Sequence, residues 1–348
     1  MAKKVRVGVI GAGAIGPAHM KGYQAGTDAE ITAVCDVDRG RAQAAAAQFG
    51  IPNVYHDHRK MLAADVVDAV SVCTPNNTHM GITIDALQAG KHVLCEKPIA
   101  MNGREARRMV DAAKSAKRIL MTAQSMRYGG SAQFLKRMVE KGRFGDIYYA
   151  KAAIFRRTGI PRGWFQDKKQ SGGGPIVDLG VHMLDVMWWL MGMPKPAIAL
   201  GATFDHLGTT GQGMGGWGVG YKPGKFSVED LGVALVRFAD GRAVGVEVSW
   251  ATHTEDSFFL RLFGTKGGAQ LFPDLELFET AADGTKMDIT PHASQLDGYS
   301  GETQHFISCV VKGKQPISPG SQSVVIMDML DAIYKSAATG RAIPVGGK

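Results

Sequence analysis

The sequence predicts an α/β fold in which a doubly wound parallel sheet is followed by an α+β domain with a large, mostly antiparallel sheet. Short strands alternate with helices as far as residue 124, and strands dominate from residue 125 onward. The 348 residues also have the length of about two domains. We therefore expect domains at residues 1–124 and 125–348, with room for the C-terminal helices to pack back on the first.

The first element is a strand followed by a glycine-rich turn. Val5–Ile10 (VRVGVI) is short and β-branched, and a helical stretch runs to Ala25 after the motif GAGAIG. A plain glycine turn is the alternative, but glycines between a strand and a helix let a pyrophosphate approach the helix N-terminus, where N–H groups favour an anion. The predicted dinucleotide contacts of this motif are Gly11, Gly13, Ala14, Ile15 and Gly16.

An acid ends the second predicted strand, Ile31–Cys35. Asp36 lies twenty residues beyond Gly16, where a carboxylate accepts hydrogen bonds from the adenosine ribose and repels a 2′-phosphate. This position predicts NAD as cofactor. NADP is possible because Arg39 and Arg41 could accommodate that phosphate.

Helices and strands continue to alternate to the end of the first domain. We expect helices at Arg39–Phe49, at Met80–Ala89 and after a capping box of Asn102 and Glu105, and strands at Ala69–Cys73, His92–Cys95 and Ile119–Ala123. Ligands bind beyond the carboxyl ends of such strands. Two loops there are candidate ligand contacts: Thr74, Pro75, Asn76, Asn77, Thr78 and His79 in one, and Glu96, Lys97 and Pro98 in the other.

Strands and hairpins make up most of the second domain. After a helix at Ser131–Lys141, the predicted strands are Ile147–Arg156, Ala197–Phe204, Val228–Phe238, Ala243–Trp250 and Phe258–Phe263. Asp240-Gly241 and Asp283-Gly284 are hairpin turns. The glycine-rich segment Gly208–Gly220 predicts a mobile loop, used as a lid or a subunit contact. The last helices are Glu302–Val311 and Gln322–Thr339.

A helix between Gly172 and Gly192 carries the strongest chemical pattern. Asp178, His182 and Asp185 recur at i, i+4 and i+7, so they project from one helical face. A carboxylate one turn before an imidazole can orient that ring and stabilise its protonated form, as a general base requires. Such pairs are also often structural, in a helix that packs its tryptophans into the core.

Composition excludes several classes of function. With 45% hydrophobic and 21% charged residues, the chain has a soluble globular composition, and no apolar run is long enough for a membrane helix or signal peptide. The formal charge is +8, but the Lys and Arg residues are scattered among acids, which argues against nucleic-acid binding. We expect a cytosolic protein, consistent with buried thiols at Cys35, Cys73, Cys95 and Cys309.

No cluster of His, Cys and carboxylate residues has the sequence spacing of metal ligands, so we expect no metal site. The isolated His206, His253 and His292 are taken as surface or core residues.

Three motifs in order resemble the Gfo/Idh/MocA oxidoreductases, the family of glucose-fructose oxidoreductase and inositol dehydrogenase. They are GAGAIG at residues 11–16, CEKPIA at residues 95–100 and SGGGPIVDLGVHMLD at residues 171–185, and the loop TPNNTH and the later FGTKGGA extend the match over the whole chain. The resemblance implies a Rossmann domain, an open-faced second domain, a nicotinamide cofactor and a polyhydroxylated substrate bound between the domains.

By this resemblance Lys97, Asp178 and His182 are the catalytic set, and they also contact the substrate. Oxidation of a secondary alcohol needs a base for the hydroxyl proton and a donor to the oxygen, roles that suit His182 and Lys97, with Asp178 orienting the imidazole. Arg127 and Trp164 lie where the family approaches nicotinamide, and Arg127 also approaches substrate. An interdomain ion pair and plain packing are the respective alternatives.

The resemblance leaves three functions open. The first is an NAD(P)-dependent dehydrogenase of a sugar, inositol or glycoside. The second is a relative that retains NAD and oxidises its sugar transiently, for glycoside cleavage or for transfer between two sugars. The third is a dinucleotide-binding sensor, which would be expected to lack the lysine or the histidine. A homodimer or homotetramer through the second sheet is also implied.

Overall fold

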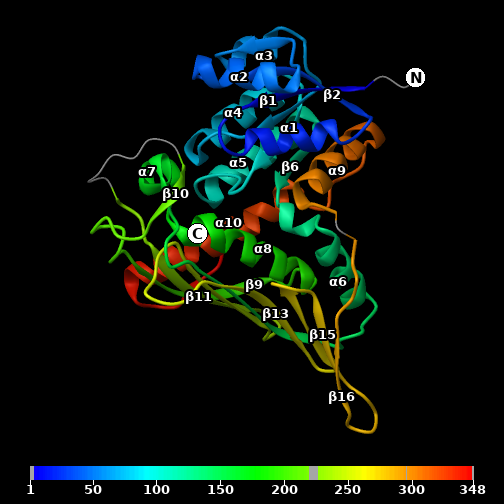
Figure 1. Ribbon diagram of the computed structural model, residues 1–348, viewed down its shortest axis with the longest axis vertical. Coiled ribbons are helices and arrows are strands. Elements are labelled where there is room, and N and C mark those ends of the chain that lie inside the picture. Colours follow the sequence, from blue (N-terminus) through cyan, green and yellow to red (C-terminus); the bar gives the residue numbers. More distant parts are fainter. Residues whose placement is uncertain (1–3, 219–225, 295, 347–348) are drawn as a thin grey trace. The chain divides into compact units, whose positions relative to one another are not determined.

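The chain folds into two compact units, which Figure 1 shows in a computed structural model that describes residues 4–218, 226–294 and 296–346. The first unit comprises Met1–Tyr128 and Leu296–Val324, and the second comprises Gly129–Gln295 and Val325–Lys348. The first unit therefore draws on two separate stretches of the sequence. No helix among the described residues is long and apolar enough to cross a membrane.

The first unit contains a six-stranded sheet in the order β3-β2-β1-β4-β5-β6, and all of its pairs are parallel. Its strands are β1 (Val5–Ile10), β2 (Ala29–Cys35), β3 (Asn53–Tyr55), β4 (Ala69–Val72), β5 (His92–Glu96) and β6 (Leu120–Ala123). The order reverses between β1 and β4, which is where such sheets bind ligands. The doubly wound parallel sheet predicted from the alternation is confirmed.

Helices surround this sheet, and several begin at a polar side-chain cap. They are α1 (Gly16–Gln24), α2 (Arg39–Phe49), α3 (His58–Ala63), α4 (Asn76–Gln88), α5 (Gly103–Ala116) and α9 (Gly298–Lys312), with the 3₁₀ turn η1 (Ser125–Arg127). The Asn102 side chain accepts the Glu105 N–H at the start of α5, which confirms the predicted cap. From the far end of the chain, α9 packs against α1 and adds Phe306 and Ile307 to the core.

Two details of the first unit differ from the sequence prediction. The short β3 and α3 were not expected, because three and six residues are too few to show a hydrophobic period. The predicted loop Thr74–His79 is mostly the first turn of α4, which begins at Asn76. Thr78 Oγ1 donates a hydrogen bond to the Pro75 carbonyl oxygen at the start of this turn, 2.7 Å away.

The second unit is built on a nine-stranded sheet in the order β16-β15-β14-β13-β7-β12-β11-β9-β17. Its strands are β7 (Ile147–Phe155), β9 (Pro196–Phe204), β11 (Leu231–Phe238), β12 (Ala243–Ser249), β13 (Ser257–Gly264), β14 (Gly267–Phe272), β15 (Glu276–Thr280), β16 (Lys286–Ile289) and β17 (Ile343–Pro344). Within the described part of this unit, only β7 and β12 pair in parallel in the nine-stranded sheet, so the mostly antiparallel sheet is confirmed. The two predicted hairpin turns are confirmed as well, with left-handed Gly241 and Gly284.

Helices cover one face of this second sheet. The remaining elements of the unit are α6 (Gly130–Glu140), α7 (Lys168–Ser171), α8 (Val181–Leu190), the 3₁₀ turn η2 (Gly163–Gln166), the π-helical turn η3 (Ile176–Gly180) and α10 (Gly320–Thr339), which begins in the first unit. Helix α8 packs on β7, β12 and β13, and Figure 1 shows it lying over the sheet. The opposite face carries exposed side chains that include Ile198, Leu200 and Leu235.

The glycine-rich segment Gly208–Gly220 contains a strand that the sequence did not predict. β10 (Met214–Gly218) pairs in parallel with β8 (Ile160–Arg162), while residues 219 and 220 lie outside the described part of the chain. The pairing gives the described part of this segment a hydrogen-bonded neighbour. A Cβ on Gly215 would lie 3.1 Å from Gly159, so the small residue allows the two strands to approach.

We predict opposite effects for alanine at two helical glycines of the first unit. Gly22→Ala should destabilise by about 1–3 kcal/mol, because its Cβ would collide with Thr303 Oγ1 of α9. Gly81→Ala, in an exposed part of α4 with nothing near the new Cβ, should stabilise by about 1 kcal/mol through helix propensity. Thermal unfolding of both variants measures this. Equal shifts would contradict the packing of α9 against α1.

Candidate active site

The glycine-rich turn after β1 fits a bound pyrophosphate. Gly11 has φ +100°, and a Cβ there would collide with the Cys73 carbonyl oxygen, while one on Gly16 would collide with the Gly11 carbonyl. These two glycines are required by the turn itself. Gly13 is different, since nothing lies within 4 Å of its Cβ position. Together with exposed Ala14 and half-buried Ile15, it leaves backbone open to a ligand at the N-terminus of α1.

Asp36 is held at the carboxyl end of β2 by both of its oxygens. Oδ2 accepts the Ala12 N–H at 2.8 Å, and Oδ1 accepts the Asp38 N–H at 2.8 Å. Arg41 also donates to Oδ1, at 3.1 Å. The Arg41 guanidinium, which could have favoured NADP by pairing with its 2′-phosphate, is therefore paired with the Asp36 carboxylate, which disfavours that phosphate.

His79 connects the two predicted ligand loops of the first unit. Its side chain is fully buried, and its ring nitrogens lie 2.8 Å from the Thr74 and Pro98 carbonyl oxygens. Burial lowers the pKa of the imidazole, so the neutral ring donates to one of the two carbonyls. The structure thus brings the loops after β4 and β5 together, as expected of neighbouring parallel strands. Contact of Thr74, Pro75, Asn76 and His79 with cofactor stays a prediction.

Lys97 follows β5 in a loop held by its neighbour Glu96. The Glu96 side chain is buried, its Oε1 lies 2.8 Å from His19 Nε2, and its Oε2 accepts the Lys97 backbone N–H at 3.0 Å. Lys97 itself is half-buried, and its bond to Pro98 is cis. The backbone of this lysine is therefore tied to a buried carboxylate.

Arg127 lies in η1 and is fully buried. Its Nη1 donates to the Ile317 carbonyl, 2.8 Å away, and to the Gln322 side-chain oxygen. Both partners are neutral groups of the first unit's C-terminal stretch. These contacts hold that stretch in place, and a role for Arg127 at cofactor or substrate stays a prediction.

Trp164 belongs to an aromatic cluster in the second unit. It stacks on Phe165 with ring centroids 3.9 Å apart, and Phe165 meets Trp217 edge-on at 5.0 Å. Trp164 remains half-buried. Its packing is therefore shown, while the predicted cofactor contact stays a prediction.

Asp178 and His182 lie at the junction of two kinds of helix, so the segment that the sequence predicted as one regular helix contains a π turn. Asp178 lies in the π-helical turn η3, and His182 lies in the first turn of α8. A π turn makes i→i+5 hydrogen bonds and holds more residues than an α turn. Such turns are frequent at functional sites. Asp178 is buried, and its Oδ2 accepts the Trp250 Nε1–H at 3.0 Å.

The glycines before this turn serve packing within the second unit. A Cβ on Gly173 would collide with the Tyr334 hydroxyl, and one on Gly174 with the Glu229 carbonyl. The buried Glu229 carboxylate also accepts the Ile176 N–H at 3.1 Å and the Tyr334 hydroxyl at 2.7 Å, which anchors the start of η3.

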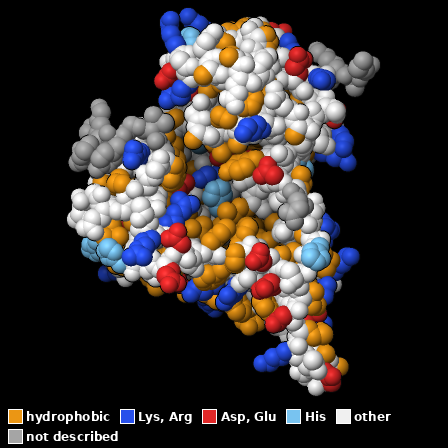
Figure 2. Space-filling model, viewed as in Figure 1, with side chains coloured by type: hydrophobic (Ala, Val, Ile, Leu, Met, Phe, Trp, Pro, Cys, Tyr) orange, Lys and Arg blue, Asp and Glu red, His pale blue; other side chains and the backbone are white. Residues whose placement is uncertain are grey.

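Figure 2 shows Lys and Arg side chains dispersed among acids on the visible face, without a basic stripe.

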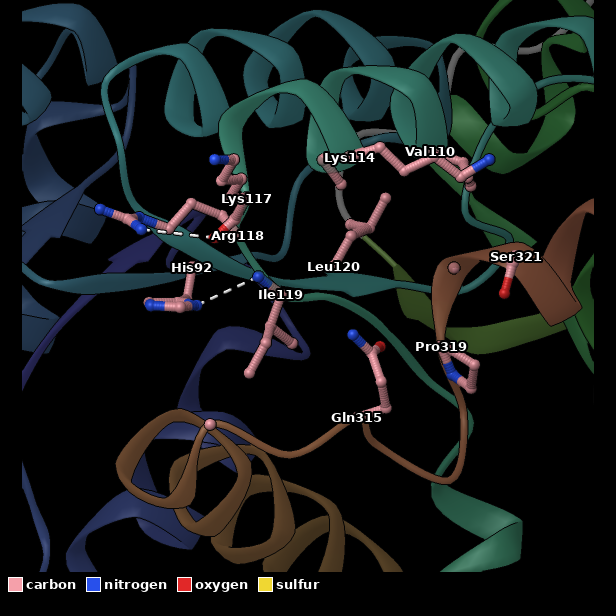
Figure 3. A pocket seen from close by; sticks show the side chains of 13 residues that line it. His92, Val110, Lys114, Lys117, Arg118, Ile119, Leu120, Gln315, Pro319 and Ser321 are labelled. Atoms are coloured by element: carbon pink, nitrogen blue, oxygen red, sulfur yellow. Dashed lines mark hydrogen bonds between the residues drawn. The ribbon is translucent and has the colours of Figure 1, made fainter.

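A cavity of about 520 Å³ in the first unit, drawn in Figure 3, is lined by His92, Lys114, Lys117 and Arg118 among others. His92 begins β5 and Leu120 begins β6, so the cavity lies at the amino ends of the strands, at the opposite edge of the sheet from the glycine-rich turn.

Comparison with known proteins decides the family. Residues 5–124 match the family described as "Oxidoreductase family, NAD-binding Rossmann fold" and residues 132–270 match the "GFO/IDH/MocA C-terminal domain". D-glucoside 3-dehydrogenase of Escherichia coli (strain K12) is 34% identical over 345 residues, which cover 97% of each chain. The chain belongs to the Gfo/Idh/MocA family. It is an oxidoreductase with an NAD-binding Rossmann domain.

Other members of the Gfo/Idh/MocA family agree in length and fold. Myo-inositol 2-dehydrogenase of Thermotoga maritima is 27% identical over 347 residues, which cover 97% of this chain and 98% of the relative. A solved levoglucosan dehydrogenase in complex with NADH and levoglucosan superposes with a TM-score of 0.86 at 23% identity, over 99% and 100% of the two chains. The second likeness supports the fold alone.

Three residues of this Gfo/Idh/MocA chain that hold its motifs were missed in the sequence. Trp250 and Glu229 anchor η3, and His19 anchors Glu96. For Trp250 and Glu229, the sequence signal was a polar or indole group next to an otherwise apolar strand. His19 occurs three residues after the last glycine of the motif, but nothing in the sequence indicated its partner, 77 residues away.

We predict that the Trp250 indole contributes more stability than a comparable indole of the same unit. Trp250→Phe removes a donor from a buried carboxylate and should cost about 2 kcal/mol. The control is Trp188→Phe, which removes a donor from the neutral Pro194 carbonyl and should cost about 1 kcal/mol. Chemical denaturation compares the two variants. A smaller loss for Trp250→Phe would show that Asp178 does not depend on this bond.

Proposed function

We propose that this chain oxidises a secondary alcohol of a sugar, inositol or glycoside, with NAD as the hydride acceptor. The observation that carries the proposal is its 34% identity to D-glucoside 3-dehydrogenase over 97% of both chains. Myo-inositol 2-dehydrogenase and levoglucosan dehydrogenase of Pseudarthrobacter phenanthrenivorans are also similar, at 27% and 28% identity. Their names share a polyhydroxylated substrate and oxidation at a CH–OH group.

The proposed cofactor contacts come from the first unit. NAD, when bound, accepts the hydride from the alcohol carbon. The open backbone of Gly13, Ala14 and Ile15 would hold the pyrophosphate, and Asp36 would accept the ribose hydroxyls. We further assign cofactor contacts to a larger set: Gly11, Gly16, Thr74, Pro75, Asn76, His79, Glu96, Lys97, Arg127 and Trp164.

NAD is preferred to NADP in this proposal because of the charge around Asp36. A 2′-phosphate would stand beside a carboxylate whose two oxygens already accept three N–H groups. Arg41, the nearest cation, is engaged by that same carboxylate and lies 3.8 Å from Asp38. Its charge is therefore partly neutralised before any ligand arrives.

The proposed chemistry uses Lys97, Asp178 and His182. His182 takes the hydroxyl proton as general base, and Asp178 orients and stabilises the resulting imidazolium. The Lys97 ammonium donates to the substrate oxygen as negative charge develops on it. Lys97, Arg127, Asp178 and His182 are the proposed substrate contacts. Trp250 holds the Asp178 carboxylate through its indole N–H, which limits the orientations available to that side chain.

A spectrophotometric screen tests the reaction. Purified protein with NAD or NADP and a panel of inositols, aldoses and glycosides should produce reduced nicotinamide, faster with NAD. Product formed without net reduction, with nicotinamide released on denaturation, would instead establish a protein that retains its cofactor and oxidises transiently. Cofactor binding with neither product nor reduction on any polyol would favour a sensor.

Alanine variants test the residue assignment. Lys97→Ala and His182→Ala should each lower kcat by about 10²-fold or more, because each removes a proton acceptor or an oxyanion donor. Lys114→Ala and His292→Ala, at exposed positions, are the matched controls and should retain full activity. Near-normal turnover in the first pair would refute the assignment.

We also propose that the chain forms a homodimer or homotetramer through the uncovered face of the nine-stranded sheet. Exposed apolar side chains of several strands share this face by the register of the sheet: Ile198, Leu200, Phe204, Leu235, Phe263 and Phe278. Leu200 and Leu235 are directly paired across β9 and β11, with exposed fractions of 48% and 45%. Adjacent exposed apolar groups on a sheet are typical of an interface.

Introduction of a charge tests this surface. Leu235→Asp should lower the molar mass measured by light scattering to that of a smaller assembly, because a carboxylate would be buried in the interface. Val311→Asp, at a comparably exposed apolar position of α9, should leave the mass unchanged. A monomeric parent protein would exclude the proposed assembly.

A further inference from the structure

Three titratable side chains from distant parts of the sequence meet inside the first unit. His19 comes from α1, Glu96 from the end of β5 and Glu302 from α9, with exposed fractions of 0%, 6% and 0%. One nitrogen or oxygen of each lies within 4.8 Å of the others. A buried group of this kind requires internal partners for its charge.

A line of hydrogen bonds runs from this cluster to the backbone of Lys97. The Tyr23 hydroxyl lies 2.6 Å from Ser71 Oγ, which lies 3.0 Å from His19 Nδ1. The other ring nitrogen, Nε2, lies 2.8 Å from Glu96 Oε1, and Glu96 Oε2 accepts the Lys97 N–H. Ser71 thus orients the His19 ring, and the His19 ring orients the Glu96 carboxylate that accepts the Lys97 N–H.

Glu302 stands beside this line as an additional acid. Its Oε1 lies 3.9 Å from His19 Nε2, beyond hydrogen-bond distance, and neither of its oxygens has a hydrogen-bond partner among the described residues. Burial, with the Glu96 and Asp297 carboxylates nearby, raises the pKa of Glu302 well above its usual range. Among the described residues, the titratable groups around this cluster include Tyr23 of α1, His79 of α4, Cys95 of β5 and Tyr299 of α9, with Cys73 and Tyr128 from the segments after β4 and η1. None of these is a lysine or arginine, and burial lowers the pKa of the His79 imidazole.

We propose that His19 and Glu302 are positioning residues for Lys97. The His19 ring orients the Glu96 carboxylate, and that carboxylate holds the Lys97 backbone. Glu302 lies beside them as an uncharged acid. The proposal rests on the proposed catalytic role of Lys97. An ionised Glu302 would compete with Glu96 for the same His19 N–H. An uncharged Glu302 leaves that N–H to Glu96.

The charge state of Glu302 has a signature in stability. Below the usual pKa of a glutamate, both the folded and the unfolded chain carry the acid uncharged. As the pH rises, the unfolded chain ionises first, so the folded protein loses stability until the pH passes the raised pKa. A glutamine at this position cannot ionise and escapes that loss.

Melting temperatures test the charge state without any assay of activity. Relative to the parent protein, Glu302→Gln should gain stability steadily as the pH rises above the usual glutamate pKa of about 4.3 toward the raised pKa of Glu302. The control Ser323→Ala, which breaks a buried hydrogen bond to Thr122 in the same unit, should shift the melting temperature equally at every pH. A loss for Glu302→Gln that is the same at every pH would overturn the proposal. A stoichiometric divalent metal in the parent protein that Glu302→Gln lacks would overturn it too, since it would make the cluster a metal site.

Turnover tests the positioning. His19→Leu removes the N–H that orients Glu96 and should lower kcat by about 10-fold to 100-fold, with smaller changes in KM and NAD affinity, since Glu96 and Lys97 are also proposed cofactor contacts. His19→Gln can donate from its side-chain amide toward Glu96 and should restore a large part of the loss. Ser323→Ala should keep the parent kcat. Equal turnover in His19→Leu, or parallel loss of NAD binding in both His19 variants, would contradict the role. A parent protein inactive on every polyol would refute the proposed function, while the melting experiment would still decide the state of Glu302.

Discussion

Buried carboxylates that accept N–H groups hold the chemically important turns of this chain. Asp36 accepts the Ala12 N–H of the glycine-rich turn, and Glu96 accepts the Lys97 N–H. Glu229 accepts the Ile176 N–H at the start of η3. A buried carboxylate is stable only where such donors compensate its lost hydration. Each of these acids therefore fixes the backbone segment whose N–H group it accepts. The side chains on that segment are held in a defined position as a result.

The connecting turns of the first unit depend on these buried acids, whereas its strands are stabilised mainly by apolar packing. The strands of the first sheet are nearly continuous apolar runs, such as Val5–Ile10 and Ala69–Val72, which pack mainly through apolar side chains. Their connecting turns carry unpaired backbone groups, which require specific acceptors. His79, whose ring lies between the Thr74 and Pro98 carbonyls, joins two of these turns.

The sequence predicted those parts of the fold that depend on local pattern. Strand-helix alternation, the GAGAIG turn, the Asn102 cap and two Asp-Gly hairpins each require only neighbouring residues, and all are present in the structure. Elements as short as β3 and β10 were missed because their formation depends on a neighbouring strand. The π turn at Asp178 was missed for a related reason. Its residues read as an α-helix, and the side chains that anchor it come from positions 229, 250 and 334.

The interleaved connectivity of the two units has a consequence for biosynthesis. The core of the first unit includes Phe306, Ile307 and Cys309, which pack with strands formed at the beginning of the chain. A ribosome must therefore synthesise nearly the whole second unit before the first can complete its hydrophobic core. The apolar surface that these late residues cover stays exposed during that interval. Aggregation of the nascent chain during synthesis then depends on how fast residues 129–295 are translated and cleared from the exit tunnel, which makes translation speed across this insertion a determinant of yield.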